Sequence, residues 1–216
     1  MVLQLPVSSI ESGLRSSFIG MLCLKRREGE MERRKQPFFE ELGSHGELKR
    51  VSTSGEALDL PWSLLLAAEC EDDAWPPTAL PMISALTPED ALEQMLLIDE
   101  RWGVSGAHVV ISAQDRFIDA EGVLEAARLF LDADYHPVLR SPLNWSVATR
   151  LSELGCLAVD VQAIVADREM MVSRPWLLER IIHDSVSPIL LSGPFSSADA
   201  RLWLSCGASA IVREED

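Results

Sequence analysis

The chain has 216 residues, and 47% of them are hydrophobic, so it is long enough to bury a sizeable core as one domain or as a domain with an arm. Its formal net charge of −15 argues against nucleic acids and anionic membranes as partners, because both attract positively charged surfaces. The sequence contains no run of about 18 apolar residues and no amino-terminal secretory signal pattern, so a cytoplasmic location is expected.

The charge is distributed unevenly along the chain. Residues 1–50 hold nine basic and seven acidic side chains, a net charge of +2, whereas the remaining residues hold ten and twenty-seven, a net charge of −17. This asymmetry, with the irregular pattern of the first part, predicts an atypical amino-terminal arm over residues 1–55 and a barrel-like domain over residues 56–216. The arm either docks on the acidic body or is solvated.

The amino-terminal part offers two candidate strands. The first is SSFIGMLCL at 16–24 and the second is WSLLLAAE at 62–69, with a charged, helix-forming segment at 25–42 between them. The run 69–78 contains four acidic residues and two prolines, which is typical of a loop.

A regular pattern begins at residue 79. The apolar run 79–85 has the length of a strand, and a helix is expected to follow it directly. Thr87 is the expected N-cap, Pro88 suits the first helical position, and Gly103 is expected to end the helix.

The same unit of strand and helix then repeats to the end of the chain. Because continuous apolar strands that alternate with amphipathic helices indicate a parallel sheet covered by helices, the fold class is α/β. The further strands are expected at 107–113, 136–141, 156–163, 187–193 and 209–213, and the further helices at 120–133, at 143–154, from Ser173 to His183, and from Ser196 or Ser197 to Gly207.

Two architectures fit this order: a doubly wound sheet and a barrel. The six regular strands and the two amino-terminal candidates make eight, the strand number of a (β/α) TIM-type barrel. Such barrels usually need about 250 residues, so a chain of this length predicts a barrel that is incomplete or irregular at its amino-terminal side.

Residues 78–213 resemble bacterial thiazole synthase, the (β/α)8 enzyme that makes the thiazole ring of thiamine. One part of the resemblance is ALPMISALTPEDALE, a strand with a leucine–proline step before an acidic helix start, and the strongest part is 119–159. The segments 174–193 and 197–212 match the last two units in order and length. Within 119–159 the matching residues are Arg150, Leu151, Glu153, Gly155 and Cys156. The resemblance implies a phosphate-binding barrel, a transferase-type activity and a role in thiamine biosynthesis.

The resemblance also implies a lysine that forms an imine with a sugar-phosphate ketone, and that position falls near Val109. The family's glutamate and aspartate positions fall at Ile111 and Leu191, which are apolar as well. Arginine stays protonated and cannot replace the amine nucleophile. The chain has only three lysines, and all precede the region of resemblance: Lys25, Lys35 and Lys49. An imine on these strands is therefore excluded unless an amino-terminal lysine reaches the strand ends, so the expected activity is not imine-based. No cofactor is predicted.

The expected phosphate site also departs from the family pattern. Glycines after the seventh strand should present backbone N–H groups to the phosphate. Here Gly193 is kept, but Pro194 removes a donor and Phe195 adds bulk. Ser196 and Ser197 remain as ligand-binding candidates at the start of the last helix; the alternative is that they only cap it.

Two charged residues complete the ligand-binding candidates. Asp160 lies within an apolar strand, where an unpaired carboxylate is costly, and Arg140 ends the preceding strand on the side where barrel active sites lie. Either Asp160 is a catalytic acid and Arg140 holds an anionic ligand, or the two residues neutralise each other. His108 lies at the start of the strand expected at 107–113, the fourth of the barrel, and is expected at the inert, amino-terminal face.

Cysteines and tryptophans leave further alternatives. The four cysteines are far apart and show no zinc or redox spacing, so no metal is predicted and Cys156 is expected to be a buried thiol. Trp145, Trp176 and Trp203 lie in helices outside the barrel, where they either pack in the core or form an interaction surface.

The sequence thus predicts a thiazole-synthase-like barrel with a degenerate site and a binding or regulatory role. The alternative is an active sugar-phosphate enzyme of the thiamine pathway with relocated catalytic residues. A sugar phosphate, a protein partner and a homo-oligomer all remain open as partners.

Overall fold

The computed structural model describes residues 47–51, 63–66, 70, 74–112, 118–162 and 175–213, all within the compact unit Arg34–Asp216. Its strands are β1 (Glu47–Val51), β2 (Ser63–Leu66), β3 (Ala79–Ala85), β4 (Gly106–Ile111), β5 (His136–Pro142), β6 (Ala158–Gln162), β7 (Ile189–Gly193) and β8 (Ala210–Arg213). Its helices are α4 (Pro88–Trp102), α5 (Ala120–Asp132), α6 (Trp145–Glu153), α8 (Pro175–Asp184) and α9 (Ser197–Ser205). None of these helices combines the length and apolarity needed to cross a bilayer.

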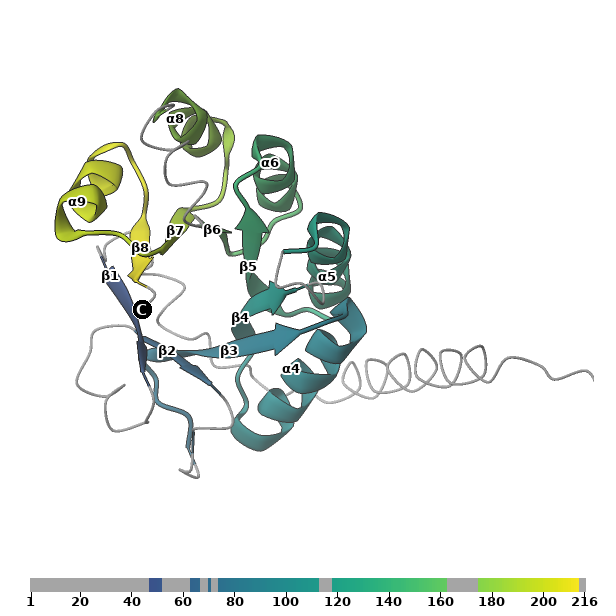
Figure 1. The fold of residues 1–216 in the computed structure, drawn as a ribbon. Helices are drawn as coiled ribbons and strands as arrows, with labels where there is room; N and C mark the ends of the chain where they lie inside the picture. Colours follow the sequence, from purple (N-terminus) through teal and green to yellow (C-terminus); the bar gives the residue numbers. More distant parts are fainter. Residues whose placement is uncertain are drawn as a thin grey trace, which may run out of the picture. The chain divides into compact units, whose positions relative to one another are not determined.

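The strands pair in chain order, all in parallel, and β8 pairs back with β1 to close the barrel. The helices lie around the outside of the strands from β3 to β8 (Figure 1). Between β2 and β3 the residues that the structure describes, Cys70 and 74–78, contain no helix. The predicted α/β class and parallel TIM-type arrangement are confirmed, with a helical layer that is documented from α4 onward.

The amino-terminal side differs from the expectation in its first strand. β2 confirms the strand expected at 62–69, but the strand that completes the eight is β1, which pairs with β2 and β8. β1 lies inside the range predicted as an arm, so a barrel strand begins before residue 56. Its sequence, ELKRV, has no apolar run, and only tertiary pairing identifies it. The segments expected at 16–24 and 25–42, like the cap at Ser173, lie outside the described residues.

The first regular helix forms as its sequence predicts. The Thr87 hydroxyl accepts a hydrogen bond from the Asp90 backbone N–H at 3.2 Å, and Pro88 occupies the first turn. Gly103 ends α4 in the left-handed conformation, with φ of 69°, where a residue with a Cβ is disfavoured. These local signals fix α4 between β3 and β4.

The interior of the barrel holds a cluster of apolar side chains. They come from β2, β3, β5, β6, β7 and β8, and strands that are not neighbours can share such a cluster only across the inside of a closed sheet. Its buried members are Leu64, Leu80, Val138, Ala158, Leu190, Ala210 and Val212. This cluster identifies which residues of each strand point inward, since side chains alternate along a strand.

Candidate functional site

A polar layer lies inside the barrel beside the apolar cluster. On β5, β6 and β7 it occupies positions two residues beyond Val138, Ala158 and Leu190, so strand alternation points its members inward and toward the carboxyl ends of the strands. Four successive strands each supply one buried side chain: His108 on β4, Arg140 on β5, Asp160 on β6 and Ser192 on β7.

These four side chains are connected by hydrogen bonds around one carboxylate. Asp160 Oδ2 lies 2.7 Å from His108 Nε2 and 2.8 Å from Arg140 Nε. The Ser192 hydroxyl lies 2.6 Å from Asp160 Oδ1, and it accepts a bond from Arg140 Nη2 at 2.9 Å. Asp160 is therefore bound from both flanking strands and from β4.

The environment keeps Asp160 ionised. Complete burial raises the pKa of its carboxyl group, but the adjacent Arg140 charge and the bonds from His108 and Ser192 lower it more, so the net pKa lies well below the usual range. Because an ionised carboxylate only accepts hydrogen bonds, His108 must donate from Nε2. The ion pair between Arg140 and Asp160, one of the two alternatives that the sequence left open, is therefore present.

The set is sealed from solvent. Asp160, Ser192 and His108 have no exposed surface, and only 7% of Arg140 is exposed. Sequence reasoning identified Arg140 and Asp160 but missed the other two residues. His108 is the third residue of β4 and lies in the polar layer rather than at an inert barrel end. Ser192 sits in the apolar run ILLSG, and its alternation with Leu190 was the one available signal.

The position that resemblance assigns to the imine lysine lies on the other side of β4. Val109 is fully buried and follows His108, so alternation turns its side chain away from the barrel interior. The inward positions beside it are occupied by His108 and Val110. β4 therefore offers no amine nucleophile at any of these three positions, whichever face they lie on.

The segment after β7 satisfies much of its own hydrogen bonding. Gly193 is buried at the end of β7, and its carbonyl accepts the Phe195 N–H at 2.8 Å. Pro194 has no N–H to offer. The packed Phe195 ring, 7% exposed, lies where a phosphate cradle needs open backbone.

The start of α9 is closed by a carboxylate from its own first turn. Ser196 is the N-cap, and its backbone N–H and hydroxyl both bind Asp199 Oδ2, at 3.1 and 2.7 Å. The Asp199 N–H returns a bond to the Ser196 hydroxyl at 3.2 Å. Ser196 is confirmed as a cap, while Ser197 is the exposed first residue of α9. An incoming phosphate would meet the Asp199 charge.

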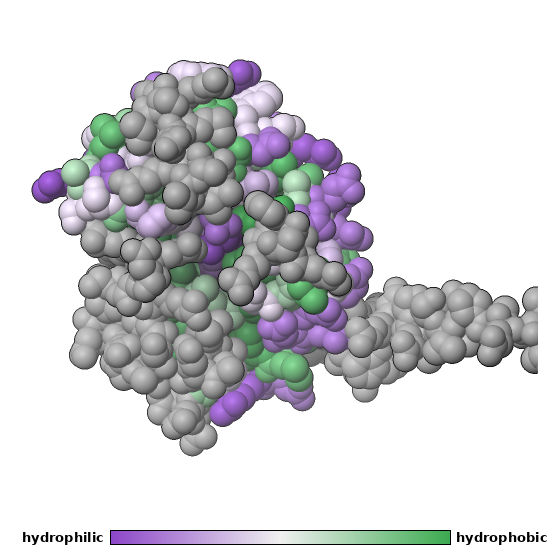
Figure 2. All heavy atoms as spheres, in the orientation of Figure 1, coloured by the Kyte–Doolittle hydropathy of each residue, from purple (hydrophilic) through white to green (hydrophobic). Residues whose placement is uncertain are grey.

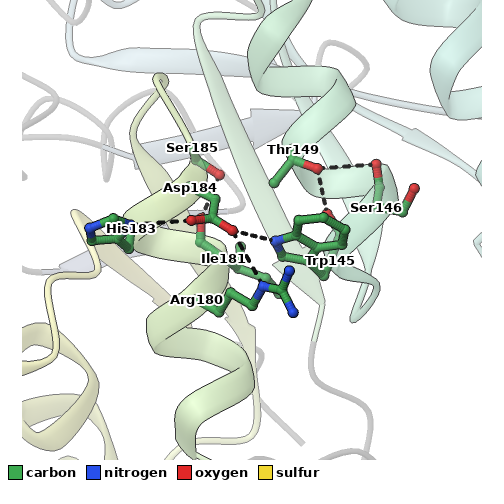
Figure 3. A network of polar contacts seen from close by, with 8 residues as sticks. All are labelled: Trp145, Ser146, Thr149, Arg180, Ile181, His183, Asp184 and Ser185. Atoms are coloured by element: carbon green, nitrogen blue, oxygen red, sulfur yellow. Dashed lines mark hydrogen bonds and ion pairs between the residues drawn. The ribbon is translucent and has the colours of Figure 1, made fainter.

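A second polar network lies on the outer surface between α6 and α8 (Figure 3). Asp184 accepts a bond from Trp145 Nε1 at 2.9 Å and lies 3.2 Å from His183 Nδ1. These bonds, with the Arg180 charge, lower the pKa of Asp184. The Arg180 guanidinium also stacks 4.1 Å from the Trp145 ring. The network ties two helices together, which accounts for Trp145 without a ligand.

We predict that Cys156 does not react with thiol reagents in the folded protein. Burial raises the pKa of its thiol to about 12, so almost no thiolate exists near neutral pH. Titration with Ellman's reagent at pH 8 should label it only after denaturant is added, whereas the part-exposed Cys206 should react beforehand. Peptide mapping of the labelled sites checks this, and rapid native labelling of Cys156 would contradict it.

In the described part of the chain, no group of three or more potential metal ligands is assembled.

No protein-family model matches the chain. Among curated proteins, thiazole synthase of Nitrosomonas eutropha is 27% identical over 97 residues, which is 44% of this chain and 36% of that protein. Thiazole synthase of Nitrosomonas europaea is 22% identical over 151 residues, 65% of this chain and 55% of the relative. The chain therefore spans only about a third to about half of the length of these curated relatives.

Solved structures share the architecture at lower identity. The Amycolatopsis orientalis BexX/CysO complex matches 85% of this chain and 77% of its own with a TM-score of 0.56 and 18% identity. A putative phosphonomutase from Burkholderia cenocepacia matches 84% and 91% with a TM-score of 0.60 and 12% identity. The tryptophan synthase A-subunit of Pyrococcus furiosus matches 78% and 86% with a TM-score of 0.54 and 11% identity. At these identities the likeness establishes the fold alone.

Proposed function

We propose that this protein is a thiazole-synthase-like barrel of the thiamine biosynthesis type that has lost imine-based thiazole formation and acts by binding. The observation that carries the proposal is the inner face of β4, where His108 and Val110 flank Val109 and no amine is available. The chain has no lysine beyond Lys49, which lies on β1, so none of the strands from β2 to β8 supplies one.

The phosphate end of the barrel supports the same proposal. A phosphate group needs open backbone N–H donors and a helix start without competing negative charge. Here the Asp199 carboxylate already binds the N-cap, and the Phe195 N–H is used by Gly193. We infer that sugar phosphates bind weakly at this position and that the retained barrel serves a protein partner. The matching solved BexX is crystallised in complex with CysO, which makes a protein partner a natural candidate.

Reductive trapping tests the loss of imine chemistry. We expect the full chain, incubated with 1-deoxyxylulose 5-phosphate and sodium borohydride, to gain no sugar-phosphate mass in intact-protein mass spectrometry. Borohydride fixes the ketone on the protein only where a primary amine has formed an imine with it, and the inner face of β4 offers no such amine. A lysine-to-arginine variant at all three lysine positions is the matched control. An adduct that appears in the natural chain and disappears in this variant would overturn the proposal.

A ligand titration tests the phosphate end separately. Ligands that bind the native state raise its melting temperature. Because we expect phosphate to bind only weakly, 1-deoxyxylulose 5-phosphate and inorganic phosphate should leave the melting temperature of the natural chain unchanged. The Asp199→Ala variant removes the competing carboxylate and should respond more than the natural chain. A saturable rise in the natural chain would show that an anion site survives.

A second candidate function is an enzyme with relocated residues, and the polar layer of the barrel favours it. His108, Arg140, Asp160 and Ser192 come from four successive strands, as catalytic groups of such barrels do. Because the set is buried, this candidate requires the barrel interior to open to a substrate. His108, held by Asp160 through Nε2, would then take a proton beside a carbonyl at Nδ1, and Arg140 would stabilise the resulting oxyanion. Deuterium uptake into a sugar-phosphate ketone from D₂O, lost in His108→Gln, would support this candidate; no uptake would exclude it for that substrate.

A further inference from the structure

An open cleft lies at the carboxyl ends of two barrel strands, outside the polar layer. It is bordered by the ends of β3 and β4 and by one face of α4, and its volume is about 470 Å³. Small-ligand sites have volumes of about 300–1,000 Å³, and the sites of parallel barrels lie at the carboxyl ends of the strands. We call this feature the α4 cleft, and its lining includes Ser84, Leu86, Glu93, Gln94, Leu97 and Ser112.

The walls of the α4 cleft are set by strand pairing and by helical spacing. β3 and β4 pair in register to their carboxyl ends, and the Ser112 N–H donates to the Ala85 carbonyl at 3.0 Å, which holds the two ends together. Leu97 lies four residues after Glu93 and three after Gln94, so these three residues share one face of α4. The cleft is therefore formed mainly by a helix and by strand ends, which position a site more firmly than loops do.

Two leucines give the cleft an apolar surface that the barrel does not cover. Leu97 is 65% exposed, and Leu86, between β3 and α4, is 61% exposed. In Figure 2, apolar and polar residues lie side by side along the edge where Figure 1 shows α4. A hydrocarbon group that lies on both leucines would remove them from water, which is favourable in proportion to the apolar area buried.

The charge of the cleft favours a cation. None of its described lining residues is basic, and the half-buried Glu93 side chain makes no hydrogen bond or ion pair with the described residues. The residues four and three positions before it are Glu89 and Asp90, which are like charges rather than counter-charges. They also offset the positive end of the helix dipole, which would otherwise favour an anion. Asp90 already has a contact within the chain, so Glu93 is the carboxylate that is left for a ligand.

We propose that the α4 cleft binds a small organic amine, whose ammonium group pairs with Glu93 and whose hydrocarbon part lies on Leu86 and Leu97. The hydroxyl groups of Ser84 and Ser112 offer further acceptors, since an ammonium group has three donors. The ten basic and twenty-seven acidic residues from 51 to 216 leave a net charge of −17, which attracts the same class of ligand from a distance. The cleft shares no residue with the polar layer, so this site is separate from both candidate functions of the barrel interior.

A matched series of ligands tests the chemistry of the cleft in the full chain. Phenethylamine, phenethyl alcohol and phenylpropionate carry the same phenylethyl group and differ in charge. Their dissociation constants are measured by NMR titration of the isotope-labelled protein at about 0.15 M salt, which screens the attraction of distant charges. We expect saturable binding of phenethylamine, about fivefold weaker binding of the alcohol, and no binding of the carboxylate, because only the amine pairs with Glu93.

Two substitutions decide whether the cleft is the site of binding. Glu93→Gln removes the charge and should weaken phenethylamine binding about fivefold, while Leu97→Ser removes apolar contact and should weaken it about threefold. The matched controls are Glu153→Gln on α6 and Leu202→Ser on α9, both at exposed positions, and they should bind like the natural chain. Circular dichroism confirms that each variant remains folded.

Three outcomes would overturn the proposal. The first is that phenethylamine does not bind the natural chain, and the second is that the three ligands bind alike. The third is equal binding by Glu93→Gln and Glu153→Gln, because the amine would then be attracted by the acidic body as a whole. Reductive trapping concerns a ketone and a lysine of the protein, so its result is independent of this one.

Discussion

Replacing Asp160 with asparagine is expected to lower the free energy of unfolding by about 3–5 kcal/mol, because it leaves the buried Arg140 charge without a counter-charge. The substitution keeps the shape of the side chain, so lost volume contributes little. It also turns an amide N–H₂ toward groups that donate to the carboxylate at 2.6–2.8 Å, namely Arg140, His108 and Ser192. Urea denaturation followed by circular dichroism measures the change. The matched control is Asp184→Asn on the exposed surface network, where a much smaller effect is expected.

A double variant separates the cost of an unpaired charge from the contribution of the pair. Asp160→Leu with Arg140→Met replaces the ion pair by apolar side chains, and buried pairs replaced in this way often lose little stability. We expect the double variant to be more stable than Asp160→Asn alone. If Asp160→Asn proves as stable as the natural chain, the polar layer does not hold Arg140 as the structure shows. The interpretation of Asp160 as the counter-charge of Arg140 would then be wrong.

The pKa of Asp160 gives the same layer a pH dependence. Its folded pKa lies below the value of about 4 that is usual for an unfolded chain. A group with a depressed folded pKa contributes stability that is present above the unfolded pKa and is lost as pH falls below it toward the folded pKa. The stability difference between the natural chain and Asp160→Asn should therefore shrink as pH drops below about 4. A difference that grows in acid would have the wrong sign.

The barrel was predictable where the sequence repeats a local pattern. The strands from β3 onward are continuous apolar runs, and α4 carries its own cap, proline and terminal glycine, so local chemistry suffices to place them. β1 was missed because ELKRV has no apolar pattern and is a strand only through its pairing with β2 and β8. Local propensity cannot report a pairing partner that lies far along the chain.

Only one pair of residues in the candidate site was predictable from the sequence. The proximity of Arg140 and Asp160 followed from adjacent strands, and the structure pairs these two residues in register. His108 and Ser192 could not be added from sequence, since strand bounds that are uncertain by one residue turn a side chain to the opposite face. The same ambiguity affects Val109, whose outward direction is fixed only once His108 is seen to contact Asp160. By contrast, the Ser196–Asp199 spacing is a capping signature, and it could have indicated that α9 supplies its own anion.

Replacing the buried tryptophan of the outer helices is expected to give the second large loss of stability. Trp203 on α9 is 2% exposed and is among the largest fully packed side chains, whereas Trp176 on α8 is 54% exposed. Trp203→Ala should destabilise the protein by about 3–5 kcal/mol, because it removes a buried aromatic ring and leaves a cavity. Trp176→Ala is the matched control, with an expected change within about 0.5 kcal/mol.

The two tryptophan variants also decide between the two roles that the sequence leaves open for these residues. A core tryptophan affects the free energy of unfolding at any protein concentration, while an interaction-surface tryptophan affects association and leaves the unfolding of the isolated chain nearly unchanged. We therefore expect Trp203→Ala to shift the urea midpoint equally at low and high protein concentration. If Trp176→Ala destabilises as much as Trp203→Ala under dilute conditions, α8 packs more deeply than its exposure indicates. If it instead weakens only association, α8 is a surface through which this barrel binds.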